Sequence, residues 1–185
     1  MTTLSPRLAL YTIAILHEPP GSAVVQGFID RIPETFAAAE QSTGFIDRER
    51  ELGDWGAVTL PGFVPEDLAG HFAQTFSLWR DVESAYAYAY AGHHAEGLKQ
   101  RHQWFRKEAH PGYVCWWVGP DHRPDTAEAV ARIEQLHAAG PGPDAFNFRQ
   151  AFDATGAPVS SAAGRKSPSP AATDDPAPIG DAGRA

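Results

Sequence analysis

Two stretches of the chain are apolar on both strand faces, and no other feature limits the possible folds as much. Residues 8–16 read LALYTIAIL and residues 113–118 read YVCWWV. Side chains in a strand alternate between its two faces, so such a stretch has to be covered on both of them. The chain is therefore predicted to place both stretches within a sheet that carries a packed layer on each side.

Periodicity predicts the elements between these two strands. An amphipathic helical stripe runs over residues 22–36, where Pro33 predicts a kink or two abutting helices. Residues 45–51 and 71–79 are predicted strands. The Gly- and Pro-rich residues 52–70 between them are predicted to form a long loop.

A central helix is predicted after the third strand, with Asp81 as its N-cap. Its buried stripe consists of residues at helical spacing: Tyr86, Tyr90, His94, Leu98, Arg101 and Phe105. A further helix over residues 126–138 begins at a capping-box pattern, Asp125 with Glu128. Residues 145–152 alternate well enough for a short final strand or an arm.

The order β-α-β-β-α-β with an extra C-terminal helix predicts an α+β fold, a ferredoxin-like antiparallel sheet with helices on one face. The other apolar face then needs cover, and a second copy of the same sheet would supply it. A closed symmetric dimer is the commonest oligomer. We therefore predict a homodimer that pairs as a dimeric α+β barrel.

The composition predicts one domain and a tail. Residues 1–153 form the predicted domain, whereas residues 154–185 are rich in Pro, Ala, Gly and Ser and almost lack large apolar side chains. Such a segment cannot offset its ordering entropy by burial, so it is predicted to be disordered.

Charge and cysteine content predict the classes of binding partner and the cellular compartment. A formal net charge of -8 gives no electrostatic reason to bind nucleic acid or an acidic membrane. The apolar run over residues 8–16 is far short of the roughly 20 residues that span a bilayer. Cys115 is the single cysteine, which is compatible with a reducing cytoplasm. We predict a soluble cytoplasmic protein.

Several short motifs along the chain form a joint pattern. They are LALY at 8–11, GF at 44–45, SLW at 77–79, H-x3-L-x5-WF at 94–105, WWV at 116–118, HRP at 122–124, EA at 128–129 and GPGPDAFNF at 140–148. Over about residues 8–153 this pattern resembles the bacterial domain-of-unknown-function 3291 family of the dimeric α+β-barrel superfamily. The resemblance implies that fold. The superfamily includes cofactor-free monooxygenases, haem proteins, isomerases and stress or binding proteins, so the resemblance alone does not choose a chemistry.

His94 is the predicted catalytic residue, with Tyr90 as its partner. Both lie on the sheet-facing stripe of the predicted central helix, where an imidazole could act as a base, donate to a carbonyl or bind haem. The alternative is a partly buried histidine that a tyrosine hydroxyl or a backbone carbonyl satisfies. His122, in the HRP motif, fits a structural turn better than catalysis.

Aromatic side chains suggest a pocket for a planar ligand. The predicted substrate-binding residues are Tyr11, Trp79, Arg101, Phe105 and Trp117. Arg101 could clamp a carboxylate, although a surface ion pair with Glu83 or Glu96 fits it better. Asp47, Glu49 and Glu51 share one strand face, but the alternating Arg48 and Arg50 favour a solvated edge strand over a carboxylate site.

Other site types lack their motifs. The sequence contains neither H-E-x-x-H nor the P-C-x-x-C partner of a zinc deaminase, so no metal ligands are predicted. Phosphate-binding glycine loops and the G-x-S-x-G elbow do not occur either.

Three functions remain from these observations. The first is a small-molecule enzyme, monooxygenase-like or isomerase-like, that acts on a hydrophobic aromatic or polyketide-like compound without a cofactor. The second is a non-catalytic small-ligand-binding or stress protein. The third is a haem enzyme with His94 as the iron ligand.

Overall fold

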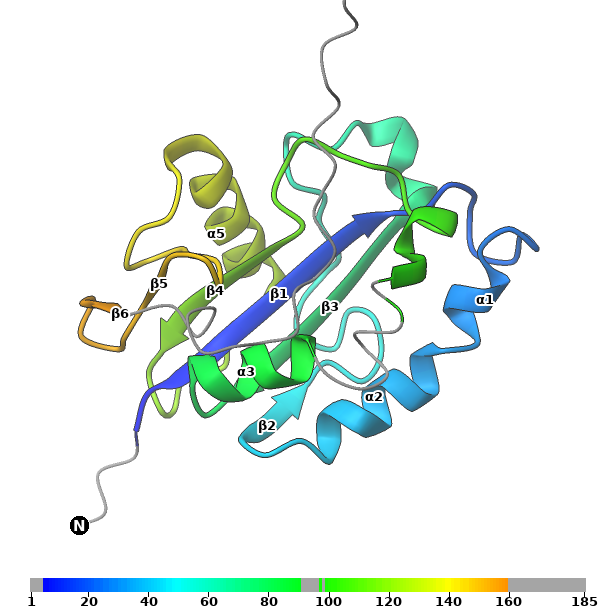
Figure 1. Cartoon of the computed structure of the whole chain (residues 1–185). Coiled ribbons are helices and arrows are strands. Elements are labelled where there is room, and N and C mark those ends of the chain that lie inside the picture. The colour runs from blue at the N-terminus through cyan, green and yellow to red at the C-terminus, as the bar shows by residue number, and fades with distance from the viewer. Residues whose placement is uncertain (1–4, 91–96, 98, 160–185) are drawn as a thin grey trace, which may run out of the picture.

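A four-stranded antiparallel sheet forms the centre of the molecule (Figure 1). The computed structural model describes residues 5–90, 97 and 99–159. The strands are β1 (Arg7–Ile15), β2 (Phe45–Arg48), β3 (Phe72–Trp79) and β4 (Tyr113–Val118), in the order β2-β3-β1-β4. β1 lies in the middle and pairs antiparallel with both β3 and β4.

Helices and a small hairpin surround the sheet. They are α1 (Gln26–Ile29), α2 (Ile32–Glu40), α3 (Val82–Ala89), α5 (Thr126–Ala139), the 3-10 helices η1 (Glu66–His71) and η2 (Arg101–Gln103), and the hairpin β5 (Ala151–Phe152) with β6 (Pro158–Val159). The strand order, with helices after β1 and β3, confirms the predicted ferredoxin-like α+β fold.

The two faces of the sheet carry two separate apolar cores. Face A contains Tyr11, Phe76 and Trp116, and α5 packs on it together with Trp55 from the β2–β3 connection. Face B contains Leu8, Trp79 and Cys115, and α2, α3 and the segment 146–159 pack on it. α3 and α5 thus lie on opposite sides of the sheet (Figure 1).

This arrangement bears on the predicted dimer. α2 and α3 lie on face B, as predicted, and the extra C-terminal helix α5 packs on face A. The chain itself covers both apolar faces of β1 and β4, and the need for a second sheet disappears as a reason for dimerisation. The homodimer stays a prediction.

Pro33 divides the first helical region as the sequence indicates. α1 ends at Ile29 and α2 begins at Ile32, with the proline in the first turn of α2, where its missing amide needs no partner. The helices therefore abut instead of forming one kinked helix.

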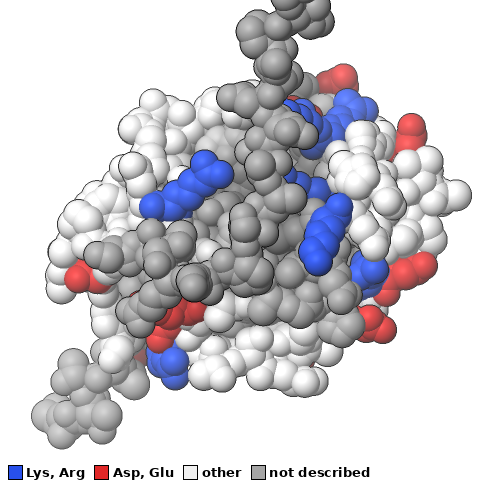
Figure 2. Space-filling model, in the orientation of Figure 1, with Lys and Arg blue, Asp and Glu red and all other residues white. Residues whose placement is uncertain are grey.

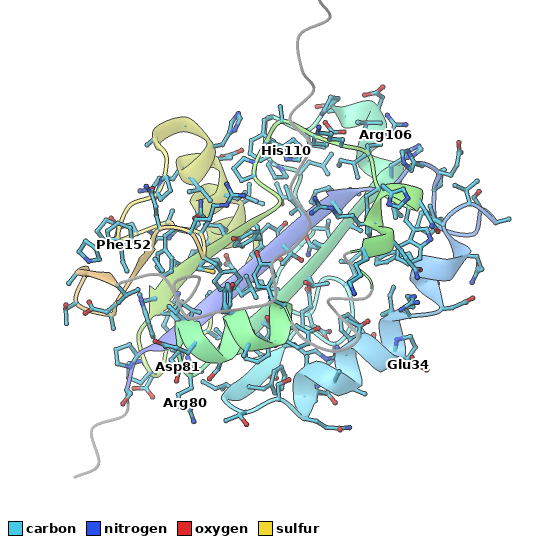
Figure 3. All side chains as sticks on the ribbon, viewed as in Figure 1. Glu34, Arg80, Asp81, Arg106, His110 and Phe152 are labelled. Atoms are coloured by element: carbon cyan, nitrogen blue, oxygen red, sulfur yellow. The ribbon has the colours of Figure 1, made fainter. Side chains whose placement is uncertain are left out.

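The start of α3 is fixed by its predicted cap. Asp81 Oδ1 accepts a hydrogen bond from Ser84 N (2.8 Å), and Arg80 Nε donates to Asp81 Oδ2 (2.8 Å; Figure 3). Burial works against the Asp81 carboxylate, but these hydrogen bonds and the Arg80 charge outweigh it and lower the pKa of Asp81. Gly44 lies against this cap with a φ of +82°, and a Cβ there would overlap the Ser84 side chain.

Several element boundaries differ from prediction. The spacing predicts one helix face through Phe105, but α3 ends at Ala89 and Arg101–Gln103 form the separate 3-10 helix η2. β2 ends at Arg48, and the next residue, Glu49, turns inward with 7% of its surface exposed instead of lying on a solvated strand. Residues 154–159, whose composition predicts a tail, form a turn and the strand β6 paired with β5. Residues 160–185 lie outside the described part of the chain.

Candidate functional site

Face B carries a gradient from apolar to hydroxyl-bearing side chains along β1. Leu8 and Leu10 share this face with Thr12, because they alternate at steps of two. Strand register places Thr75 and Tyr113 on either side of Thr12, so three hydroxyl-bearing side chains form one row across β3, β1 and β4. We call Thr75, Thr12 and Tyr113 the hydroxyl row.

The two threonines of the hydroxyl row bond to each other. Thr12 Oγ1 and Thr75 Oγ1 are 2.6 Å apart, and Thr75 is exposed. Two hydroxyl groups carry two protons, and their mutual hydrogen bond uses one of them. The other proton can be donated to an oxygen atom placed above the row. The next residues of the same parity on β1 and β3, Ala14 and Ala73, pair with each other and have small side chains.

Aromatic rings border one end of the hydroxyl row. Tyr86 and Tyr90 lie one helical turn apart with their ring centroids at 4.6 Å, and Phe148 meets Tyr86 edge-on at 5.6 Å. Phe148 also packs against Tyr113 at 5.1 Å. Tyr90 is 39% exposed, an unusual position for an aromatic ring beside a core. We call Tyr86, Tyr90 and Phe148 the aromatic wall.

Tyr113 joins the wall to the row and stays protonated. Its hydroxyl accepts a hydrogen bond from Phe148 N (3.1 Å). Burial raises the pKa of Tyr113 above its usual value, and the nearby Tyr90 adds to this increase, whereas the Phe148 amide acts in the opposite direction. Tyr113 is therefore a neutral hydroxyl at neutral pH, which suits binding of an uncharged ligand.

The structure brings only some of the predicted site residues together. Tyr90 lies at the aromatic wall, whereas Trp79 and Trp117 lie at the opposite end of face B from the hydroxyl row. Their indoles donate to Ser77 Oγ (2.9 Å) and to Phe152 O (2.8 Å). Both tryptophans thus already have partners within the fold.

The other predicted residues lie away from this site. Tyr11 is fully buried on face A, where its hydroxyl donates to Gln74 Oε1 (2.9 Å). Phe105 packs on Phe28 with ring centroids 4.8 Å apart, and Arg101 is exposed in η2. His94 lies outside the described residues.

Sequence reasoning missed the hydroxyl row. The sequence did contain one indication of it. Along one face of the strand LALYTIAIL, the side chains change from leucine at positions 8 and 10 to threonine at position 12. Which strand neighbours meet Thr12 depends on register, however, and register is set by contacts distant in sequence.

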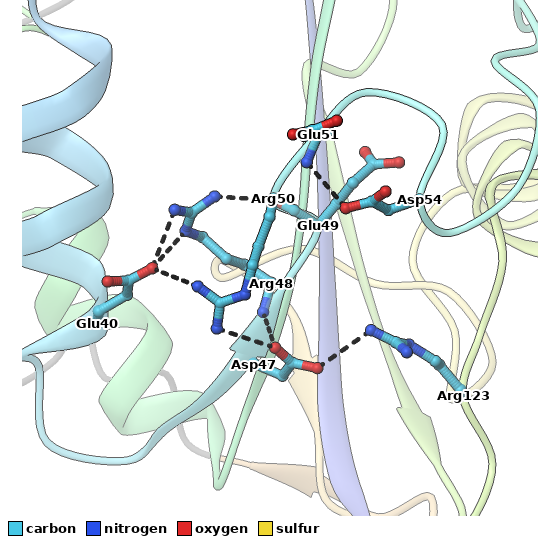
Figure 4. A network of polar contacts seen from close by, with 8 residues as sticks. All are labelled: Glu40, Asp47, Arg48, Glu49, Arg50, Glu51, Asp54 and Arg123. Carbon is cyan, nitrogen blue, oxygen red and sulfur yellow. Dashed lines mark hydrogen bonds and ion pairs between the residues drawn. The ribbon is translucent and has the colours of Figure 1, made fainter.

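The family-like motifs have structural roles next to face A. Glu128 Oε1 accepts from Trp116 Nε1 (2.8 Å), and its Oε2 lies 2.6 Å from His122 Nε2. The guanidinium carbon of Arg123 lies 4.8 Å from the centroid of the Trp55 ring. Arg123 Nη2 also forms an ion pair with Asp47 Oδ2 at 3.3 Å (Figure 4). The HRP motif therefore anchors the turn between β4 and α5.

A groove at the other end of face B is less suited to a ligand. A shallow groove of about 260 Å³ lies between Trp117, Arg132 and the β5–β6 turn. Its polar groups bond to each other: Arg132 Nη1 donates to Asp144 O (3.1 Å), and Asp153 accepts from Thr155 and Ala157.

Among the described residues, neither a cluster of metal-ligating side chains nor a membrane-spanning helix occurs. Within residues 5–90, 97 and 99–159 no group of three or more metal-ligating side chains gathers. No helix in the same residues is long and apolar enough to cross a bilayer. Figure 2 shows acidic and basic side chains interspersed on the face that it draws, among the described residues.

The fold and the motifs define a ferredoxin-like α+β protein. The chain belongs to the family described as "Domain of unknown function (DUF3291)", whose model matches residues 7–162. A comparison with curated proteins found no match.

Solved structures show distant similarity. Those found include PA3566 from Pseudomonas aeruginosa (11% identity, TM-score 0.41, 63% of this chain and 95% of that chain). A second is the NE2512 protein of unknown function from Nitrosomonas europaea (12% identity, TM-score 0.41, 62% of this chain and 89% of that chain). A third is a dabb family protein with a ferredoxin-like fold from Mesorhizobium loti (13% identity, TM-score 0.38, 64% of this chain and 100% of that chain). Similarity at this level supports no conclusion about function.

Proposed function

We propose that the protein binds a hydrophobic, ring-bearing small molecule on face B, between the aromatic wall and the hydroxyl row. The observation that carries the proposal is the Thr12–Thr75 pair, whose mutual hydrogen bond uses one of two hydroxyl protons and whose Thr75 is exposed. The partly exposed Tyr90 ring supplies a stacking surface at the Tyr113 end of the hydroxyl row. A ligand that fits both has an aromatic or polyketide-like ring and a neutral carbonyl or hydroxyl oxygen.

A comparison of two probes tests this pairing of ring and oxygen. Naphthalene offers a ring alone, and 1-naphthol adds one hydroxyl. Thr75→Val should weaken binding of 1-naphthol by about 2- to 10-fold, the equivalent of one neutral hydrogen bond, and leave naphthalene unchanged. Tyr90→Ala should weaken both probes.

Thr59→Val is the matched control for this experiment. Thr59 is also exposed, but its hydroxyl donates to Ala57 O in the β2–β3 connection. This variant should bind both probes like the wild type. Equal binding of both probes by wild type, Thr75→Val and Tyr90→Ala would contradict the proposal.

A catalytic form of the proposal adds His94 to this site. In it, His94 and Tyr90 polarise or deprotonate the ligand oxygen, which fits a monooxygenase-like or isomerase-like reaction without a cofactor. The position of Tyr90 beside the hydroxyl row supports this form. The expected result is turnover that His94→Ala abolishes while 1-naphthol binding persists; binding without turnover in the wild type supports a non-catalytic binding protein.

Hemin titration separates the haem alternative. A saturable Soret band in the wild type that disappears in His94→Ala would favour haem ligation over the cofactor-free site. The proposal predicts no such band.

A further inference from the structure

We infer that the segment 49–64 is an intramolecular plug: it closes face A, so that the chain cannot pair sheet to sheet and stays single in solution. This inference concerns the face opposite to the proposed ligand site. It also opposes the homodimer that the sequence predicts, and it is independent of the proposed function.

The plug occupies the centre of face A. Trp55 is 3% exposed and meets Phe76 edge-on, with ring centroids 4.8 Å apart. Phe63 packs on the same core next to α5. Two sheets that pack face to face lie about 10 Å apart and interdigitate their side chains. Trp55 and α5 fill the space that a second sheet would need.

Glu49 fixes the start of the plug from inside. Its Oε1 accepts hydrogen bonds from Gly53 N (2.9 Å) and Trp55 N (3.3 Å), and its Oε2 accepts from Gln74 Nε2 (3.3 Å). A buried carboxylate is tolerated only when its oxygens find donors, so this geometry is specific to the closed segment.

Further contacts join the plug to α5 and its preceding turn. Thr126 N donates to Trp55 O (2.7 Å), and Gly62 N donates to Glu134 Oε1 (2.6 Å). Arg123 covers the outer face of the Trp55 ring at 4.8 Å and pairs with Asp47 (Figure 4). The plug therefore contacts β3 through Trp55 and Glu49, α5 through Trp55 and Gly62, and Arg123 through the Trp55 ring.

Opening the plug would expose an apolar surface. Phe76, which Trp55 now covers, would face water on β3 next to the Tyr11 ring of β1, whereas α5 would still cover Trp116. An exposed apolar patch drives association, and the most complementary partner for a twisted sheet face is a second copy of it. The plug thus determines whether the β3 side of face A is available for pairing, while α5 covers the β4 side.

The test is the mass of the full chain in solution, measured by light scattering during size exclusion over a wide range of concentrations. Wild type should have the mass of one chain throughout. Trp55→Ala should shift toward two chains as concentration rises. Leu52→Ala is the control, because Leu52 is an exposed apolar residue of the same segment; it should behave like the wild type.

Two results would overturn the inference: a wild-type particle of two chains, or a Trp55→Ala protein that keeps its near-ultraviolet circular dichroism and stays single. If Trp55→Ala fails to fold, Arg123→Gln decides, since it releases the outer contact without emptying the core. It should accelerate hydrogen exchange at the amides of residues 53–56, and unchanged exchange there would also overturn the inference.

Discussion

Glu128 is the residue whose replacement tests the account of the HRP turn most closely. Its carboxylate accepts from the indole of Trp116, which is almost fully buried, and lies 2.6 Å from His122, which is more than half exposed. Glu128→Ala leaves the indole N–H without an acceptor inside the core, which costs about 1–3 kcal/mol. The loss of the exposed His122 pair adds only about 0.2–1 kcal/mol.

The expected loss in free energy of unfolding is therefore about 1–4 kcal/mol, dominated by Trp116. For a domain of this size each kcal/mol shifts Tm by about 2–4 °C, so Tm should fall by about 2–16 °C. Glu128→Gln keeps one amide oxygen for the indole and should recover most of this stability. Urea unfolding of wild type and both variants measures the difference.

Gln135→Ala, an exposed change on the same helix, is the control and should stay within about 0.5 kcal/mol of wild type. His122→Ala should cost much less than Glu128→Ala. If Glu128→Ala were as stable as the control, or His122→Ala as damaging as Glu128→Ala, the assignment of Glu128 to the buried indole would be refuted.

Three further predictions concern single residues. Gly44→Ala should lower stability by more than about 1 kcal/mol in urea unfolding, because alanine is strained at a φ of +82° and its Cβ overlaps Ser84; an unchanged midpoint would contradict this. Burial, only partly opposed by Arg48, raises the pKa of Tyr88 to about 12. Because the unfolded phenol ionises near pH 10, wild type should lose stability between pH 10 and 12, less steeply in Tyr88→Phe. Asp81→Ala should cost about 0.5–2 kcal/mol at pH 7; since the pKa of Asp81 is lowered in the folded state, this difference should shrink as pH falls below about 4 and through the folded pKa.

Local patterns predicted the elements whose signals lie within a few residues. Asp81 and Asp125 cap their helices as expected, accepting from Ser84 N and Glu128 N. Pro33 separates two helices. Each of these outcomes depends on one turn of backbone, so the sequence holds the required information.

Contacts between distant segments escaped prediction. The alternating charges predicted a solvated edge strand at Glu49, but this residue is buried. Its carboxylate accepts hydrogen bonds from the backbone amides of Gly53 and Trp55. The alternation of side chains along β1 correctly placed Tyr11 on the opposite face from Leu8 and Leu10. No short sequence pattern, however, indicated which face of the sheet α5 would cover. Burial of this kind is decided by tertiary packing.

The candidate site shows the same division. Tyr90 was predicted from its helical spacing, and it lies at the aromatic wall. The hydroxyl row was not predicted, because Thr12, Thr75 and Tyr113 come together only through the register of three strands.

The most direct test of the central claim is to locate the bound probe by nuclear magnetic resonance. Titration of methyl-labelled protein with 1-naphthol should shift the methyl groups of Thr12, Thr75 and Ala14 on face B and leave those of Ile13 and Val114 on face A unchanged. Thr75→Val should reduce the shifts at Thr12. Shifts confined to face A or to the groove beside Trp117, or no saturable shifts at all, would contradict the claim that face B holds the ligand site.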